Sequence, residues 1–239
     1  MAVHAYIPEV QSNLLLAVTT IICIIGVYLL ISRWGHGRPG RFFSSWAHEA
    51  FRDGIGTFLR VLVLDVLLFR RTWKRSKGRW VMHMTIFWGF IFLTGFLLLS
   101  ITGHILLYID PYGVGGTFSR YITSLQLPYS LVGYLVLAAS GIALFRRLLV
   151  KKVRERTRFS DFFLIGSIFI IALTGMIAEW FSGYDTIVGP AIKNWELALQ
   201  FLALHLYAAL LLFLMMIPWS RFRHIIATPL LLLARRGGD

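Results

Sequence analysis

Five long runs of apolar residues dominate the sequence, and they restrict the chain to the folds that a lipid bilayer permits. Each run approaches or exceeds the roughly 20 residues that an α-helix needs to cross the hydrocarbon core. No water is available to the backbone inside that layer, so each run must satisfy its own hydrogen bonds as a helix. The predicted membrane spans are residues 13–31, 80–107, 128–145, 161–181 and 197–219.

The composition supports the same fold class. Hydrophobic residues make up 57% of the 239 residues, and the mean hydropathy is +0.71, which leaves too little polar surface for a soluble domain. We therefore predict an all-α, multi-pass integral membrane protein that forms a single domain. A shorter run, residues 55–69, carries Arg60 and Asp65, and we expect it to form an amphipathic helix on the membrane surface or against a partner.

The positive charges predict the orientation of the spans. Of the 24 Lys and Arg residues, 22 fall in residues 33–79, in residues 146–158 and after residue 219, whereas the alternate loops hold only Arg120 and Lys193. Cytoplasmic loops carry the excess of positive charge, so we expect the N-terminus outside and the C-terminus in the cytoplasm. The same rule accounts for the net charge of +13, and it predicts anionic lipid or an acidic protein as the partner and no nucleic acid. Two interpretations of these basic loops remain open: they also bind a partner protein, or they only set the topology and bind lipid.

Four of the seven histidines lie in or beside two of the spans, where an ionisable side chain is costly and therefore a functional hypothesis. His83 and His104 belong to the second span, and His205 and His224 to the fifth. These two spans run in opposite directions, so His83 would lie level with His224 near the inner face. His104 would lie level with His205 near the outer face. The remaining histidines, His4, His36 and His48, are expected to be solvated loop residues.

Two opposed imidazoles are what the axial positions of a haem iron require, and two level pairs therefore predict two haems. A histidine that only bonds a neighbouring helix is the alternative interpretation. A single zinc or copper site is not favoured, because 21 residues separate the histidines of the second span and 19 those of the fifth. Nineteen α-helical steps miss the starting face by about 100°, which counts against His224, although Pro218 could kink the helix between them.

Other residues near these histidines are candidates to contact a haem. Glycines could admit the macrocycle close to the second span, or they could serve only helix packing. The candidates are Gly89, Gly95 and Gly103. Arg221 and Arg223 flank His224 and could pair with haem propionates at the inner face.

Three stretches of the sequence carry a resemblance to a known family. They are residues 69–90 around His83, residues 146–161, and the segment in which His205 is followed by Ile217-Pro-Trp-Ser-Arg221, His224 and Pro229. The chain resembles the gamma subunit of respiratory nitrate reductase, a five-span dihaem cytochrome b, and the related membrane subunits of heterodisulfide reductase-type complexes. The second branch fits better. His104 lies further along its span than in the first branch, and Thr123 and Ser124 stand where that branch has a quinol-site lysine.

The resemblance implies that His83 and His224 hold an inner haem and that His104 and His205 hold an outer one. It also implies a quinol site beside the outer haem, menaquinone or another quinone as substrate, and a cytoplasmic iron–sulfur partner of the heterodisulfide reductase-like type. The location would be the prokaryotic cytoplasmic membrane. The expected function is electron transfer between the quinone pool and that partner. A haem-free membrane anchor and a small transporter are the alternatives, and the transporter lacks both midplane charges and repeated halves.

A quinol site needs an acceptor for protons, and two carboxylates lie near the predicted outer end of the spans. Glu179 closes the fourth span and Asp110 follows the second, so both are candidates, unless they are ordinary interfacial residues. Tyr112 and Arg120 are candidates to bond a quinone carbonyl.

Overall fold

The computed structural model describes residues 3–110, 112–182, 193–214, 218–219 and 224–234, and all regular structure within these ranges is helical. Five of the described helices are long and apolar enough to cross a membrane, which confirms the predicted number of spans. The candidate spans are Ala17–Trp34, Lys77–Ser100, Gln126–Leu149, Phe159–Phe181 and Trp195–Leu212. The orientation of the termini stays a prediction.

The chain divides into two compact units. The first comprises Met1–Trp80, Arg158–Ser167 and Leu206–Asp239, and the second comprises Val81–Thr157 and Ile168–His205.

In the first unit, the spanning helix α1 (Val3–Trp34) buries a narrow face of small residues. Thr19, Cys23 and Gly26 lie about one turn apart on this face and are buried. The face contacts the π-helix η2 (Ala209–Leu214), and a side chain at Gly26 would overlap Pro218. Small residues allow helix backbones to approach closely where lipid supplies no hydrophobic driving force.

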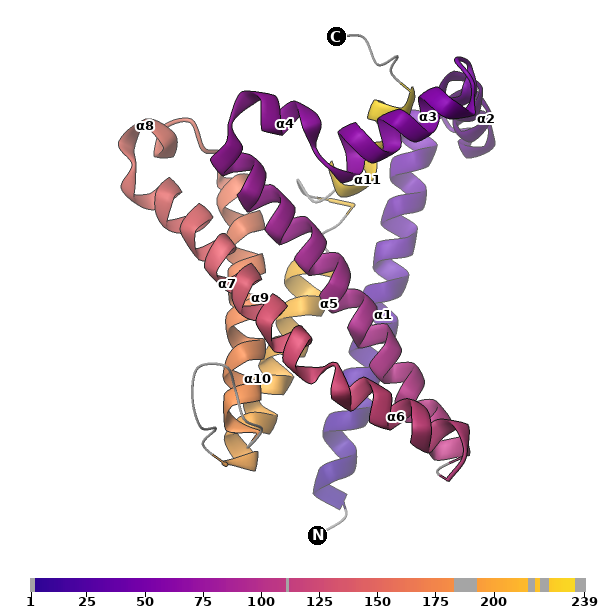
Figure 1. Ribbon diagram of the computed structural model, residues 1–239. Coiled ribbons are helices and arrows are strands. Elements are labelled where there is room, and N and C mark those ends of the chain that lie inside the picture. The colour runs from indigo at the N-terminus through magenta and orange to yellow at the C-terminus, as the bar shows by residue number, and fades with distance from the viewer. Residues whose placement is uncertain (1–2, 111, 183–192, 215–217, 220–223, 235–239) are drawn as a thin grey trace. The chain divides into compact units, whose positions relative to one another are not determined.

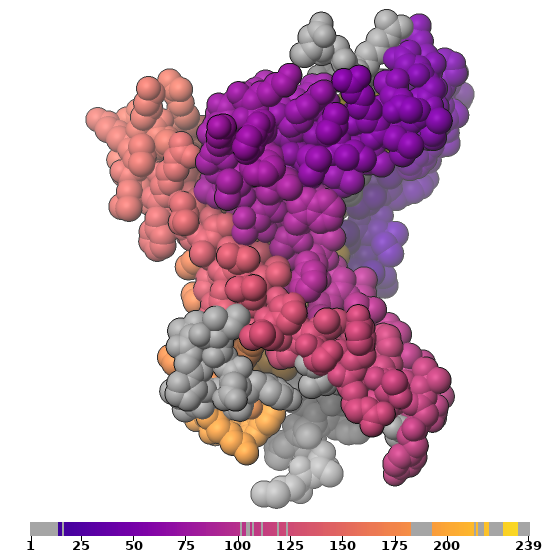
Figure 2. All heavy atoms as spheres, viewed as in Figure 1, coloured from indigo at the N-terminus to yellow at the C-terminus, as the bar shows by residue number. Residues whose placement is uncertain are grey.

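Shorter helices gather at the C-terminal end of α1 (Figure 1). Helix α2 (Pro39–Phe51) contacts α1, and α11 (His224–Ala234) contacts α2, α3 (Ile55–Val61) and η1 (Leu62–Leu67). The side chains of α2, α3 and η1 form one continuous surface in Figure 2. A short helix, α4 (Arg70–Arg75), then leads into the second span.

Residues 55–69, where the sequence predicts an amphipathic helix, are helical from Ile55 to Leu67. α3 passes into the π-helix η1, which ends before Phe69, a residue in the left-handed region at φ 49°. Asp65 is buried in η1. Its Oδ1 accepts a hydrogen bond from Arg70 Nε at 2.9 Å, and Arg71 Nε lies 3.6 Å from Oδ2. Two guanidinium groups thus compensate the charge of this buried carboxylate. The position of this segment on a membrane surface stays a prediction.

In the second unit, α5 (Lys77–Ile109), α7 (Gln126–Leu149) and α9 (Phe159–Phe181) pack through glycines. Gly89 of α5 lies against Val136 of α7, and Gly133 of α7 lies against Met176 of α9. The four-residue helix α8 (Lys151–Arg154) follows α7. These contacts place α7 between its two neighbours, with the polar side chains of its first turns close to the end of α9.

Residues 108–127, which the charge pattern predicts to be an outer loop, contain an additional helix, α6 (Val114–Ser124). Phe118 and Ile122 of α6 pack against Gly103 of α5, because apolar residues recur on one face of this short helix. The carboxylate of Asp110 accepts hydrogen bonds from the backbone N–H groups of Gly113 and Val114 at 3.0 and 2.9 Å. Asp110 thereby satisfies backbone donors at the start of α6.

The fifth span differs from the continuous α-helix expected over residues 197–219. Helix α10 (Trp195–Ala208) passes into η2, and α11 begins only at His224. A π-helix holds more residues per turn than an α-helix, so a count of 19 α-helical steps does not relate the faces of His205 and His224. The offset of about 100° therefore carries no weight against His224.

The buried ion pairs of Asp65 predict a stability effect. We expect Asp65→Ala to lower the free energy of unfolding by about 2 kcal/mol, because it leaves Arg70 and Arg71 without their counter-charge while both stay partly hydrated. Thermal unfolding followed by circular dichroism in detergent measures this effect. Asp53→Ala, at an exposed position, is the matched control and should leave the midpoint unchanged. Equal midpoints for the two variants would contradict a structural role for Asp65.

Candidate functional site around helix α9

His205 of α10 is held against α9 by a hydrogen bond from its ring. Its Nδ1 lies 2.8 Å from the backbone oxygen of Ile171, and Thr174 Oγ1 lies 3.5 Å away. A carbonyl oxygen only accepts, so Nδ1 carries the proton and donates it. The other ring nitrogen, Nε2, therefore keeps its lone pair. An imidazole oriented in this way, with one nitrogen held by a carbonyl, is the usual state of a histidine that ligates a metal.

Gly175 of α9 makes room for this ring. A Cβ atom at residue 175 would lie 3.0 Å from both Nδ1 and Cε1 of His205, closer than ordinary contacts allow. Ile171, which accepts the hydrogen bond, and Gly175 lie one helical turn apart, so together they form a surface of α9 on which the imidazole packs. Gly175 was not among the predicted site residues. The available signal was the spacing of four residues that separates Ile171, Gly175 and Glu179.

Glu179 is buried at the end of α9, one turn beyond Gly175 and about 6 Å further along the helix. Its Oε1 accepts hydrogen bonds from the hydroxyl of Ser130 and from Gln126 Nε2 at 3.4 Å, both on α7. Its Oε2 is buried and has no hydrogen-bond partner among the described residues. A buried carboxylate oxygen without a partner is costly, so it favours a polar ligand at this position. Ser130 and Gln126 were not among the predicted site residues.

The other predicted quinone-site residues have different surroundings. Asp110 uses both carboxylate oxygens on the backbone of α6. Tyr112 is 99% exposed, and Arg120 is exposed and donates to Thr117 Oγ1 at 3.4 Å. No hydrogen bond or ion pair joins these three side chains to Glu179 in the described part of the chain. Of the four candidates, Glu179 has the setting of an internal acid–base group.

The remaining predicted haem contacts are described only in part. His83 lies on α5 and its side chain is exposed. Only the backbone is described for His104 and His224, and Arg221 and Arg223 lie outside the described residues. The two histidine pairings therefore stay predictions.

The glycines of α5 fall into two kinds. Gly89 and Gly103 contact side chains of neighbouring helices, whereas Gly95 has nothing within 4 Å of the position of a Cβ. Space at Gly95 and the oriented imidazole of His205 both fit an axial histidine beside a macrocycle.

The sequence matches the family HdrE, which is described as part of dihydromethanophenazine:CoB–CoM heterodisulfide reductase, over residues 59–232. The HdrE proteins from Methanosarcina thermophila and Methanosarcina acetivorans are 31% and 30% identical, each over 96% of this chain and 93% of their own. The one from Methanosarcina barkeri is 32% identical over 92% of this chain and 90% of its own. No solved structure matches.

The packing of His205 on Gly175 predicts that substitution by alanine affects the free energy of unfolding differently at two glycines of α9. We expect Gly175→Ala to destabilise the protein by about 1–3 kcal/mol, because the methyl group displaces the ring and stretches its bond to Ile171. Gly166→Ala is the control, since nothing lies within 4 Å of its Cβ position, and helix propensity alone should leave it neutral or stabilising. Thermal unfolding midpoints of the two variants in detergent measure the difference. If the thermal unfolding midpoint of Gly175→Ala equals or exceeds that of Gly166→Ala, the ring of His205 does not pack on Gly175.

Proposed function

The chain belongs to the HdrE family of dihydromethanophenazine:CoB–CoM heterodisulfide reductase, and on that premise we propose that it is the membrane electron-transfer subunit of such a reductase. It is a multi-pass integral membrane protein of the prokaryotic cytoplasmic membrane. Its substrate is dihydromethanophenazine or a related quinol, and its partner is a cytoplasmic iron–sulfur protein of the heterodisulfide reductase type. The observation that carries the proposal is the oriented imidazole of His205 against α9, the helix that also carries the buried carboxylate of Glu179.

Two b-type haems would be held by the four membrane histidines: His83 with His224, and His104 with His205. When bound, each haem supplies one-electron transfer at a potential that its ligands and surroundings tune. The protein's own contribution is best seen at His205. Ile171 fixes the tautomer, Gly175 admits the ring, and both hold the imidazole in one orientation. A ligand fixed in this way undergoes little rearrangement when the charge of its metal changes.

Oxidation of a dihydrophenazine or a quinol releases two electrons and two protons, so the site needs a base as well as an electron acceptor. Glu179 meets the requirement. Ser130 and Gln126 hold Oε1, and Oε2 remains to accept a proton. Glu179 follows Gly175, which contacts the ring of His205, by one helical turn, and this supports its role as a base near the ligand proposed for the outer haem. Asp110 is the weaker candidate, because it already accepts two backbone hydrogen bonds.

The His205 proposal predicts the loss of one redox centre. We expect His205→Ala to remove one of two b-type components from a potentiometric titration of the purified protein, because the outer iron loses an axial ligand. His48→Ala, at an exposed position on α2, is the control and should retain both components. Retention of both components in His205→Ala would contradict the assignment of this ligand.

The Glu179 proposal predicts a defect in oxidation of the organic donor alone. Glu179→Gln keeps the size and the contacts of the side chain but removes the base, so we expect haem reduction by a reduced phenazine to slow by about 100-fold or more. Reduction by dithionite, which needs no base from the protein, should be unchanged. Glu196→Gln, an exposed substitution at the start of α10, is the control. Equal stopped-flow rates for Glu179→Gln and wild type with the phenazine would rule out this role for Glu179.

A further inference from the structure

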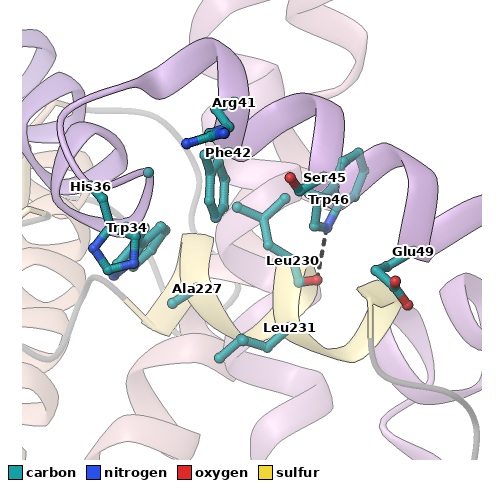
Figure 3. Close-up of a pocket in the computed structure, with 11 residues that line it drawn as sticks. Trp34, His36, Arg41, Phe42, Ser45, Trp46, Glu49, Ala227, Leu230 and Leu231 are labelled. Carbon is teal, nitrogen blue, oxygen red and sulfur yellow. Dashed lines mark hydrogen bonds between the residues drawn. The ribbon is translucent and has the colours of Figure 1, made fainter.

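A hollow of about 710 Å³ lies in the first unit, at the C-terminal end of α1 (Figure 3). Its walls come from the end of α1, from α2 and from α11, and none of its described lining residues is among the residues proposed for electron transfer. The volume lies within the range of small-molecule binding sites.

The inner wall of the hollow is apolar. Phe42 and Trp46 of α2 and Leu230 and Leu231 of α11 are among its lining residues, and Leu230 lies next to Trp46 (Figure 3). The indole Nε1–H of Trp46 donates to the backbone oxygen of Leu230 at 2.8 Å. The only polar group of that side chain is thus satisfied, and the indole presents apolar surface to an occupant.

The rim of the hollow carries the guanidinium group of Arg41 and the imidazole of His36. Arg41 and His36 line it, both are exposed, and no salt bridge of the described residues involves either of them. Glu49, the one carboxylate among the described lining residues, lies 3.8 Å from Arg52, which is not among the lining residues, so it already has a cationic partner. An anionic group at the rim would therefore meet Arg41 without a competing carboxylate in the described lining.

The hollow also lies at the membrane boundary. Trp34, one of its lining residues, is the last residue of α1 and of the candidate span Ala17–Trp34. Tryptophan is enriched where hydrocarbon meets headgroups. An occupant with an anionic head and an apolar body, as a membrane lipid has, matches the two halves of the lining.

We propose that this hollow binds one anionic phospholipid. The phosphate contacts Arg41 and His36 at the rim, and the chain segments next to the headgroup lie against Phe42, Leu230 and Leu231. The bound lipid would tie α2 and α11 to the end of α1. The proposal is independent of haem binding and of the electron carrier.

Native mass spectrometry of the full-length protein in detergent tests this proposal, with phosphatidylglycerol and phosphatidylcholine as probes. We expect one tightly retained phosphatidylglycerol per chain and weaker retention of phosphatidylcholine. Arg41→Ala should lower the retention of phosphatidylglycerol by about tenfold, the value of a charge-assisted hydrogen bond. Leu231→Trp, which fills the apolar half from a 55% exposed position, should lower it as well. Arg38→Ala is the control. It removes the same charge three residues earlier in the sequence, at a residue that does not line the hollow, and should not change the retention of phosphatidylglycerol.

Three results would overturn the proposal. Equal losses in Arg41→Ala and Arg38→Ala would show diffuse attraction to the basic surface. Displacement of the lipid by millimolar inorganic phosphate, together with an unaffected Leu231→Trp, would assign the rim to free phosphate. A photoreactive amino acid can replace Ser45, which lines the hollow, in the assembled complex. If it labels another protein of the reductase and no lipid, the hollow is occupied by a partner protein.

Discussion

The structure depends on one constraint: a polar side chain within an apolar helix bundle must find a partner, and one that does not bond a carbonyl of its own helix must find it on a neighbouring helix. Helix α9 meets this constraint twice within two turns. The carbonyl of Ile171 accepts the Nδ1–H of His205, and the carboxylate of Glu179 accepts the hydroxyl of Ser130. Both bonds join helices that are distant in sequence, so they fix α9 against α10 on one side and against α7 on the other. The groups that carry the proposed chemistry are therefore also groups that hold the second unit together.

Glycines make these two bonds geometrically accessible. Gly175 lies under the ring of His205, and Gly133 lies against Met176, so both neighbours of α9 can approach its backbone. Gly175, against which the imidazole packs, and Glu179, whose Oε2 has no partner among the described residues, then lie about one helical turn apart on α9. Electron transfer from an organic donor requires this combination, because a fixed redox centre and a base must both lie beside the donor. Asp65 of the first unit differs from Glu179, because two arginines pair with both of its carboxylate oxygens and leave neither oxygen for a ligand.

Hydrophobic run length was sufficient to predict the five spans, because hydrocarbon thickness leaves few alternatives to a helix of that length. The sequence also singled out His205 and Glu179, since ionisable groups at membrane depth are rare. The match to the HdrE family confirms the heterodisulfide reductase branch of the resemblance, whereas the likeness to the nitrate reductase gamma subunit stays a prediction. What could not be predicted depends on contacts between distant segments. Helix α6 needs Gly103 as its counter-surface, and Gly175 gains its role only when His205 packs on it.

The proposed function depends on two b-type haems held by the membrane histidines of this chain. Haem content is measured by the pyridine haemochrome method in full-length protein produced with an ample haem supply. We expect two b-type haems per chain and a reduced-minus-oxidised spectrum typical of low-spin, six-coordinate iron. Protein that is folded and membrane-inserted yet free of haem would refute the electron-transfer function and would favour a plain membrane anchor.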